Sequence, residues 1–143
     1  MKSFAIGEEV HERVEVTVLG YEREATGEFY DDNWLSCEIR VRAGAFSGNF
    51  PASFLTSEFT QLQQSLERLY RDLRGDVVFE SMENQLELKF TCDSVGHIAV
   101  LGTAQDQAGI GNKLAFSMSF DQTYLQRLVQ ALGHVVHAYP VRT

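Results

Sequence analysis

The residues with the clearest chemical potential lie between positions 31 and 34. Asp31-Asp32-Asn33 is a compact carboxylate cluster, followed at once by Trp34. Paired carboxylates are typical of hard-cation sites and of acid–base pairs, and an exposed tryptophan beside them is typical of an interface. Asp and Asn also favour turns, because their side chains bond the local backbone. We therefore interpret the cluster first as a turn, second as part of a partner-binding patch, and third as a catalytic or metal site.

The stretch before this cluster is an unusually acidic connection. Its sequence from Tyr21 to Tyr30, YEREATGEFY, is long for a hairpin loop and lies between two predicted strands. Loops held on a rigid sheet often carry function, although a plain solvated loop is the simpler interpretation. Ten of the 20 acidic residues fall within residues 1–38, so the net charge of −8 is concentrated there. The candidate partner-binding residues are Glu22, Glu24, Glu28, Tyr30, Asp31, Asp32 and Trp34.

Other reactive residues favour structural roles. Cys37 and Cys92 alternate with polar residues in apolar runs, which predicts buried reduced thiols. His134 and His137 have a spacing that suits one helical face, but Gly133 is expected to end the helix before them, and zinc needs further ligands. The chain has no glycine-rich phosphate motif and no GxSxG elbow. These activities therefore lack support in the sequence, and we predict no cofactor or metal.

Length and composition favour one cytoplasmic domain. The chain has 143 residues, of which 44% are hydrophobic and 22% charged, as in an ordinary globular protein. We expect a single domain over residues 1–143, with an ordered core over about residues 12–133 and terminal segments 1–11 and 134–143 whose order the sequence leaves open. Apolar runs are too short to span a membrane, and no signal peptide is evident. The acidic excess argues against nucleic acid as a partner.

Hydrophobic periodicity predicts an α+β fold. Alternation indicates strands near 13–22, 34–43, 45–51, 77–79, 86–92, 98–100 and 114–120. Helical stripes run from Phe59 to Leu73 and from Asp121 to Gly133. We expect about seven antiparallel strands in one or two sheets, with the two amphipathic helices packed on one side. Residues 45–50 (AFSGNF) are similar in sequence to residues 115–120 (AFSMSF). This similarity indicates either a duplicated strand-strand-strand-helix unit or the accidental repetition of a generic strand pattern.

Several segments together resemble a known family. They are DNWL at 32–35, RAGAFSG at 42–48, GNKLAF at 111–116 and DQTYL at 121–125. Over roughly residues 12–132 the sequence resembles the small bacterial WapI-type immunity proteins. The resemblance implies a non-enzymatic cytosolic antitoxin that binds a cognate toxin domain and occludes its active surface. An acidic face would suit a toxin with a basic cleft, such as a nuclease domain, because complementary charge speeds association.

Two other functions stay open at this point. A self-associating scaffold or interaction module would use an exposed apolar patch or an unpaired strand edge. A small-molecule binding module or an unrecognised enzyme would need a deep pocket with converging polar groups and a perturbed titratable residue. The identity of the toxin, the strand order and homo-oligomerisation are not determined by the sequence.

Overall fold

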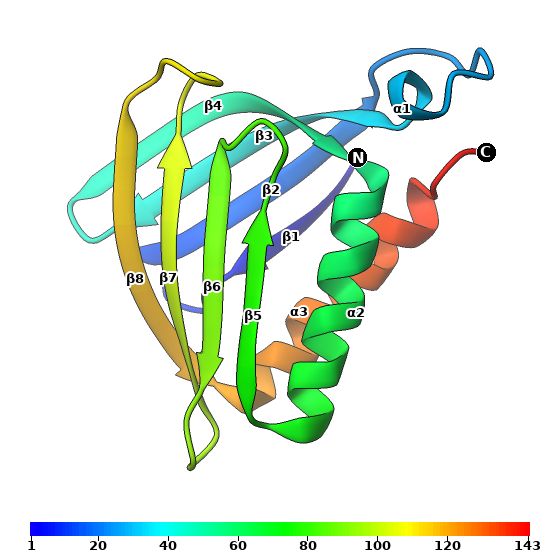
Figure 1. The fold of residues 1–143 in the computed structure, drawn as a ribbon. Coiled ribbons are helices and arrows are strands. Elements are labelled where there is room, and N and C mark those ends of the chain that lie inside the picture. The colour runs from blue at the N-terminus through cyan, green and yellow to red at the C-terminus, as the bar shows by residue number, and fades with distance from the viewer.

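Two antiparallel four-stranded sheets and three helices make up the fold (Figure 1). The computed structural model describes all 143 residues. The first sheet has the order β1-β2-β3-β4 and the second β5-β6-β7-β8. The strands are β1 (Lys2–Ile6), β2 (Glu12–Tyr21), β3 (Trp34–Ala43), β4 (Phe46–Leu55), β5 (Gly75–Glu80), β6 (Leu86–Cys92), β7 (His97–Gln105) and β8 (Lys113–Asp121). The helices are α1 (Phe29–Asp32), α2 (Thr56–Asp72) and α3 (Gln122–Ala138).

The same order of elements occurs twice along the chain. Four strands form a meander and lead directly into a long helix, first β1 to β4 with α2 and then β5 to β8 with α3. The predicted α+β class is confirmed, and the repeated unit contains four strands rather than three. The additional strand is β1, which the sequence did not reveal because only Phe4 and Ile6 mark its buried face.

One continuous core lies between the inner faces of the two sheets and the long helices. Along β3, the side chains of Leu35, Cys37, Ile39 and Val41 are buried, while the intervening residues face outward. This alternation follows from the two-residue period of a strand. Phe54 on β4 contacts Phe59 on α2 and Phe79 on β5, with ring centroids 5.1 and 6.0 Å apart, so the core spans both halves.

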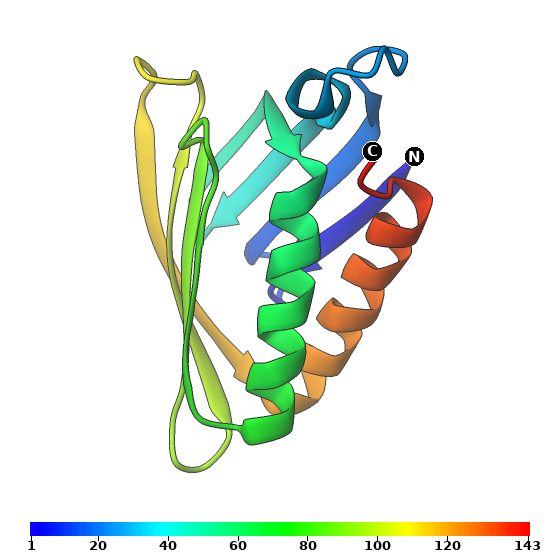
Figure 2. The same ribbon diagram turned by 45° about the vertical axis from the view of Figure 1, so that its right-hand side comes forward.

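The long helices pack against each other on one side of the sheets, as predicted (Figure 2). Helix α3 also contacts β1, and α2 contacts β5, so each helix covers an edge strand. Glu58 accepts a hydrogen bond from the backbone N–H of Leu55 at 2.8 Å and so caps the start of α2. No helix is both long enough and apolar enough to cross a membrane.

The predicted end of the last helix at Gly133 is wrong. Helix α3 continues to Ala138 and buries Leu132 and Val135 in the core. Glycine costs about 1 kcal/mol relative to alanine inside a helix, and continued burial of the apolar stripe outweighs that cost. A Cβ atom at Gly133 would lie 3.0 Å from Nε2, at the flexible end of the Gln63 side chain, so this position lies beside α2. Residues 2–6 and 134–138, outside the expected core of 12–133, therefore belong to regular elements.

Candidate functional site

Because the order of elements is repeated, the length of each loop in one half can be compared with that of the equivalent loop in the other half. In the second half, β6 and β7 are joined by the four residues 93–96, whereas in the first half β2 and β3 are joined by the twelve residues 22–33. We call residues 22–33 the α1 loop, because they contain that short helix. The fold itself closes the equivalent connection with four residues, so the remaining length of the α1 loop is available for function.

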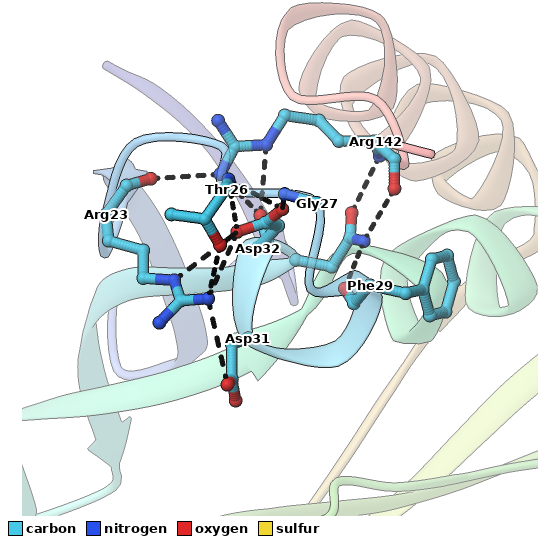
Figure 3. A network of polar contacts seen from close by, with 8 residues as sticks. Arg23, Thr26, Gly27, Phe29, Asp31, Asp32 and Arg142 are labelled. Carbon is cyan, nitrogen blue, oxygen red and sulfur yellow. Dashed lines mark hydrogen bonds and ion pairs between the residues drawn. The ribbon is translucent and has the colours of Figure 1, made fainter.

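The carboxylate of Asp32 organises the interior of the α1 loop (Figure 3). Asp32 is only 4% exposed and accepts hydrogen bonds from the backbone N–H groups of Thr26, at 2.9 Å, and Gly27, at 2.8 Å. It also accepts bonds from the Thr26 hydroxyl, at 3.1 Å, and from the Arg23 guanidinium, at 3.3 Å. Burial raises the pKa of Asp32, but these hydrogen bonds together lower it below its usual value. Asp32 therefore acts as an internal turn residue, as our first interpretation proposed.

Asn33 ties the α1 loop to two distant segments. Its side chain is buried and donates hydrogen bonds to the carbonyl oxygens of Phe29, at 2.7 Å, and Arg142, at 2.8 Å. It accepts bonds from the backbone N–H of Arg142, at 2.7 Å, and from the Thr56 hydroxyl, at 2.8 Å. One amide thus holds the loop, the start of α2 and the C-terminal segment together. The sequence placed Asn33 in a turn, but not its partners more than 100 residues away.

Arg142 fastens the C-terminal segment over the base of the loop. Its guanidinium donates hydrogen bonds to the carbonyl oxygens of Asp32, at 3.0 Å, and Arg23, at 2.9 Å. The same group lies 3.7 Å from the centroid of the Tyr21 ring, which is a cation–π contact. The Tyr21 hydroxyl donates a hydrogen bond to the carbonyl oxygen of Pro140. Sequence analysis missed Arg142, because a single basic residue in a C-terminal segment carries no local signal.

The outer surface of the α1 loop combines aromatic rings with carboxylates. Phe29 is 47% exposed and Tyr30 is 67% exposed, and the two rings meet edge to face with centroids 5.4 Å apart. Glu28 and Asp31, which adjoin these rings in the sequence, are also exposed, and Asp31 forms an ion pair with Arg23 at 3.7 Å. Glu24 is exposed on the same loop, where it lines a hollow with Tyr21, Arg23 and Arg142. Large exposed aromatic side chains are frequent energetic anchors of protein interfaces. The sequence prediction missed Phe29, whose position beside Tyr30 in an acidic loop was the available signal.

The remaining predicted residues lie at the base of the loop. Glu22 accepts a hydrogen bond from the Ser53 hydroxyl on β4 at 3.0 Å. Trp34 is half-buried at the start of β3, opposite Leu55. Five of the seven predicted residues therefore lie exposed on the loop, and one of these, Glu22, also contacts β4. Asp32 is internal and Trp34 is partly covered.

The fold separates the acidic residues of the N-terminal part into groups. Glu8, Glu9 and Glu12 lie at the β1–β2 turn. They are at the opposite end of β2 from the α1 loop, about 33 Å away for a ten-residue strand. Glu15 and Glu38 lie on the sheet between them and form ion pairs with Arg13, at 3.3 Å, and Arg40, at 3.5 Å. The acidic surface relevant to the candidate site therefore consists of the carboxylates of the α1 loop alone.

The other reactive residues are placed away from this loop surface. Both cysteines are free and buried, as predicted, and burial raises the pKa of Cys37 to about 12, so its thiolate is suppressed at neutral pH. His134 and His137 are exposed on α3, and the prediction that they belong to a solvated tail is wrong because α3 continues past Gly133. The structure contains no group of three or more His, Cys, Asp or Glu side chains placed to hold a metal ion.

Replacing Arg142 by alanine is expected to loosen the α1 loop without unfolding the sheets. The substitution removes charge-assisted hydrogen bonds and the cation–π contact with Tyr21, each worth about 1 kcal/mol or more. We expect amide hydrogen exchange in residues 24–32 to become about tenfold faster or more, measured by mass spectrometry. Arg68→Ala, at an exposed position of α2, should leave this exchange unchanged. Equal exchange in both variants would show that Arg142 does not fasten the loop.

These features define a class of protein. The chain is a small α+β protein with a repeated order of four strands and a helix, and its longest connection is a braced loop that exposes aromatic and carboxylate side chains. The model of the Immunity protein WapI-like family matches residues 5–140, and the chain belongs to this family. The match confirms the resemblance predicted over residues 12–132 and extends it to β1 and the end of α3.

No curated protein matches the sequence. Among solved structures, the chain is similar to one described as "Crystal structures of trypanosoma bruciei MRP1/MRP2". That similarity has 12% sequence identity, covers 96% of this chain and 85% of the other, and has a TM-score of 0.44. Membership in an immunity-protein family indicates a toxin-neutralising role with a protein toxin as partner.

Proposed function

We propose that the protein is a non-enzymatic, cytoplasmic immunity protein that binds a cognate toxin domain through the α1 loop and blocks its active surface. Family membership supports the toxin-neutralising role. The observation that carries the choice of site is the exposed pair Phe29 and Tyr30, on a loop that also exposes carboxylates and that the second half of the fold lacks. The two free thiols are compatible with a reducing compartment.

The chemistry of the loop specifies the kind of surface it would fit. Glu24, Glu28 and Asp31 would face Lys and Arg side chains, as in the cleft of a nuclease toxin. The rings of Phe29 and Tyr30 would fill an apolar hollow between those basic groups. Complementary charge would raise the association rate, and the buried rings would slow dissociation.

The internal bonds of the loop would contribute to affinity by holding it in one conformation. Ordering a free loop on binding costs roughly 1–2 kcal/mol for each backbone residue that becomes fixed. The contacts of Asp32 and Asn33 fix much of this backbone before any partner arrives. Such preorganisation reduces the free-energy cost of association.

Replacing Tyr30 by alanine is expected to weaken binding to the cognate toxin domain about 30-fold, because truncation of a central aromatic anchor costs about 2 kcal/mol. The toxin domain encoded beside the gene would be purified in an inactivated form, and its Kd measured by calorimetry. Tyr70→Ala is a matched control, since Tyr70 is an exposed tyrosine on α2. Tyr30→Phe should bind nearly as tightly as the wild type.

Two results would contradict the proposal in different ways. If the wild-type protein does not bind the neighbouring toxin and cells without it survive that toxin, the immunity function is wrong. If the toxin binds but Tyr30→Ala and Tyr70→Ala behave alike, the function holds and the α1 loop is not the binding site.

A further inference from the structure

A second loop is also longer than its counterpart in the duplicated fold. Strands β3 and β4 are joined by Gly44 and Ala45 alone, whereas β7 and β8 are joined by residues 106–112, which we call the 106–112 loop. Within this loop, Ile110 is 85% exposed. Each half of the fold therefore extends one connection that the other half keeps short. Figure 1 shows both extended loops at the upper end of the molecule.

The two extended loops flank the same patch of the first sheet. A hollow of about 400 Å³ is lined by Ser36, Pro51 and Ser53 from β3 and β4 and by Ala108 and Ile110 from the 106–112 loop. Ser53 is also the residue whose hydroxyl binds Glu22 of the α1 loop, at 3.0 Å. One serine thus lies between the two loops, and the surface is continuous from the acidic loop to Ile110.

The 106–112 loop is held in place by hydrogen bonds at its base. The buried side chain of Gln85 donates to the carbonyl oxygens of Pro51, at 3.1 Å, and Gln105, at 3.2 Å, and so joins β4 to the end of β7. The Asp106 carboxylate accepts a bond from the backbone N–H of Asn112 at 2.8 Å. A Cβ atom at Gly111 would lie 2.3 Å from that carboxylate, so the closure depends on glycine. The loop presents Ile110 from a braced backbone rather than from a free chain.

We infer that the 106–112 loop is the second wall of the toxin-binding surface, an inference that rests on the function proposed above. The α1 loop contains only twelve residues, whereas a stable interface uses about 20–30 residues on each side, so the toxin must cover adjacent surface. Ile110 contacts an apolar side chain of the toxin, and the hollow beside it, most of whose lining residues are polar, accepts a protrusion of the toxin surface. Glu22 and Asp106, on the two sides of the hollow, select basic groups around that protrusion. The occupant is the same basic toxin domain that the α1 loop binds.

Replacing Ile110 by serine is the direct test of this second wall. We expect Ile110→Ser to weaken binding of the cognate toxin domain about tenfold, chiefly through faster dissociation measured by biolayer interferometry. Val95→Ser is the matched control, because Val95 is 72% exposed in the turn at the other end of β7. Toxin binding should also slow amide hydrogen exchange in residues 107–112 and leave residues 93–96 unchanged.

The outcomes separate this inference from the proposed function. If the wild type binds, Tyr30→Ala weakens binding, and Ile110→Ser matches Val95→Ser with no protection of residues 107–112, the second wall is wrong and the proposed function stands. If the wild type does not bind the toxin at all, the proposed function fails first. If the two loops contribute independently to binding, the losses of binding free energy from Tyr30→Ala and Ile110→Ser should add in the double variant to within about 0.5 kcal/mol.

Discussion

Replacing Asp32 by alanine is expected to abolish the order of the α1 loop and to weaken toxin binding at least about 100-fold. The substitution removes the acceptor for the N–H groups of Thr26 and Gly27 and the partner of the Arg23 guanidinium. A toxin would then have to order the loop as it binds, at roughly 1–2 kcal/mol for each residue fixed, and a loss of 100-fold corresponds to only about 2.7 kcal/mol. Hydrogen exchange of residues 24–32 and the Kd for the toxin measure the two effects.

Asp31→Ala is the control that separates organisation from charge. Asp31 is the adjacent carboxylate, but it is exposed, and its ion pair with Arg23 is long, at 3.7 Å. An exposed pair of this kind contributes less than about 1 kcal/mol. Asp31→Ala should therefore reduce affinity less than tenfold and leave hydrogen exchange in the loop unchanged. If the two alanine variants have the same effect on exchange, Asp32 does not organise the loop.

The lowered pKa of Asp32 predicts how the order of the α1 loop depends on pH. Burial raises the pKa of Asp32, but the hydrogen bonds from Thr26, Gly27 and Arg23 lower it overall, so its pKa in the folded protein is below that in the unfolded chain. The stabilisation is therefore complete above the unfolded pKa and is lost as the pH falls through the lowered folded pKa. Loop protection in the wild type should persist at neutral pH and be lost only in acid. Asp32→Ala should lack this acid step.

The regular elements were largely predictable because each one carries its own periodic signal. The alternation from Leu35 to Val41 fixed both the strand β3 and its buried face, and the stripe from Phe59 to Leu69 did the same for α2. Strand β1 was missed because five residues with two inward side chains lie below the length at which alternation is distinctive. The end of α3 was misplaced because Gly133 was interpreted as a helix stop, whereas the burial of Leu132 and Val135 continues the helix past it.

The candidate site could be predicted only in part, because its contacts join residues far apart in the chain. Local composition was enough to select the acidic stretch and to interpret Asp32 as a turn residue. It could not show that Asn33 and Arg142 bind each other, since a pairing across 109 positions leaves no mark in either neighbourhood. Nor could it show that Glu8 and Glu12 would lie at the far end of β2, away from the loop. Charge counted along the sequence therefore overstated the charge gathered on one surface.

Each long loop has a short counterpart in the other half of the fold. In an unrepeated fold, a long loop could be a requirement of the chain path. Here the equivalent connections are closed by four residues at 93–96 and by two residues at 44–45, so the same path is achieved with short turns. The chain path therefore does not require the extra length of the α1 loop or of the 106–112 loop, and both extensions border Ser53 on the first sheet. This asymmetry supports one shared surface more strongly than charge does.

Replacing Phe54 by alanine is expected to lower the free energy of unfolding by about 3–5 kcal/mol, the largest stability effect we predict. Its ring has no solvent exposure and packs against Phe59 and Phe79, so the substitution leaves a cavity where β4, α2 and β5 meet. Typical domains have only about 5–15 kcal/mol of stability, so this loss should lower the midpoint of thermal unfolding by about 10 °C or more. Urea denaturation followed by circular dichroism measures the change.

Phe46→Ala is the matched control for this core position, because Phe46 begins the same strand and is 67% exposed. Its removal should change the free energy of unfolding by less than about 0.5 kcal/mol, as is usual for surface positions. Phe54 joins both halves through Phe79, so Phe54→Ala should lower one cooperative transition of the whole chain. Two separate transitions in this variant, one for each half, would show that the shared core does not couple the repeats, and equal losses from both alanine variants would show that Phe54 is not central to it.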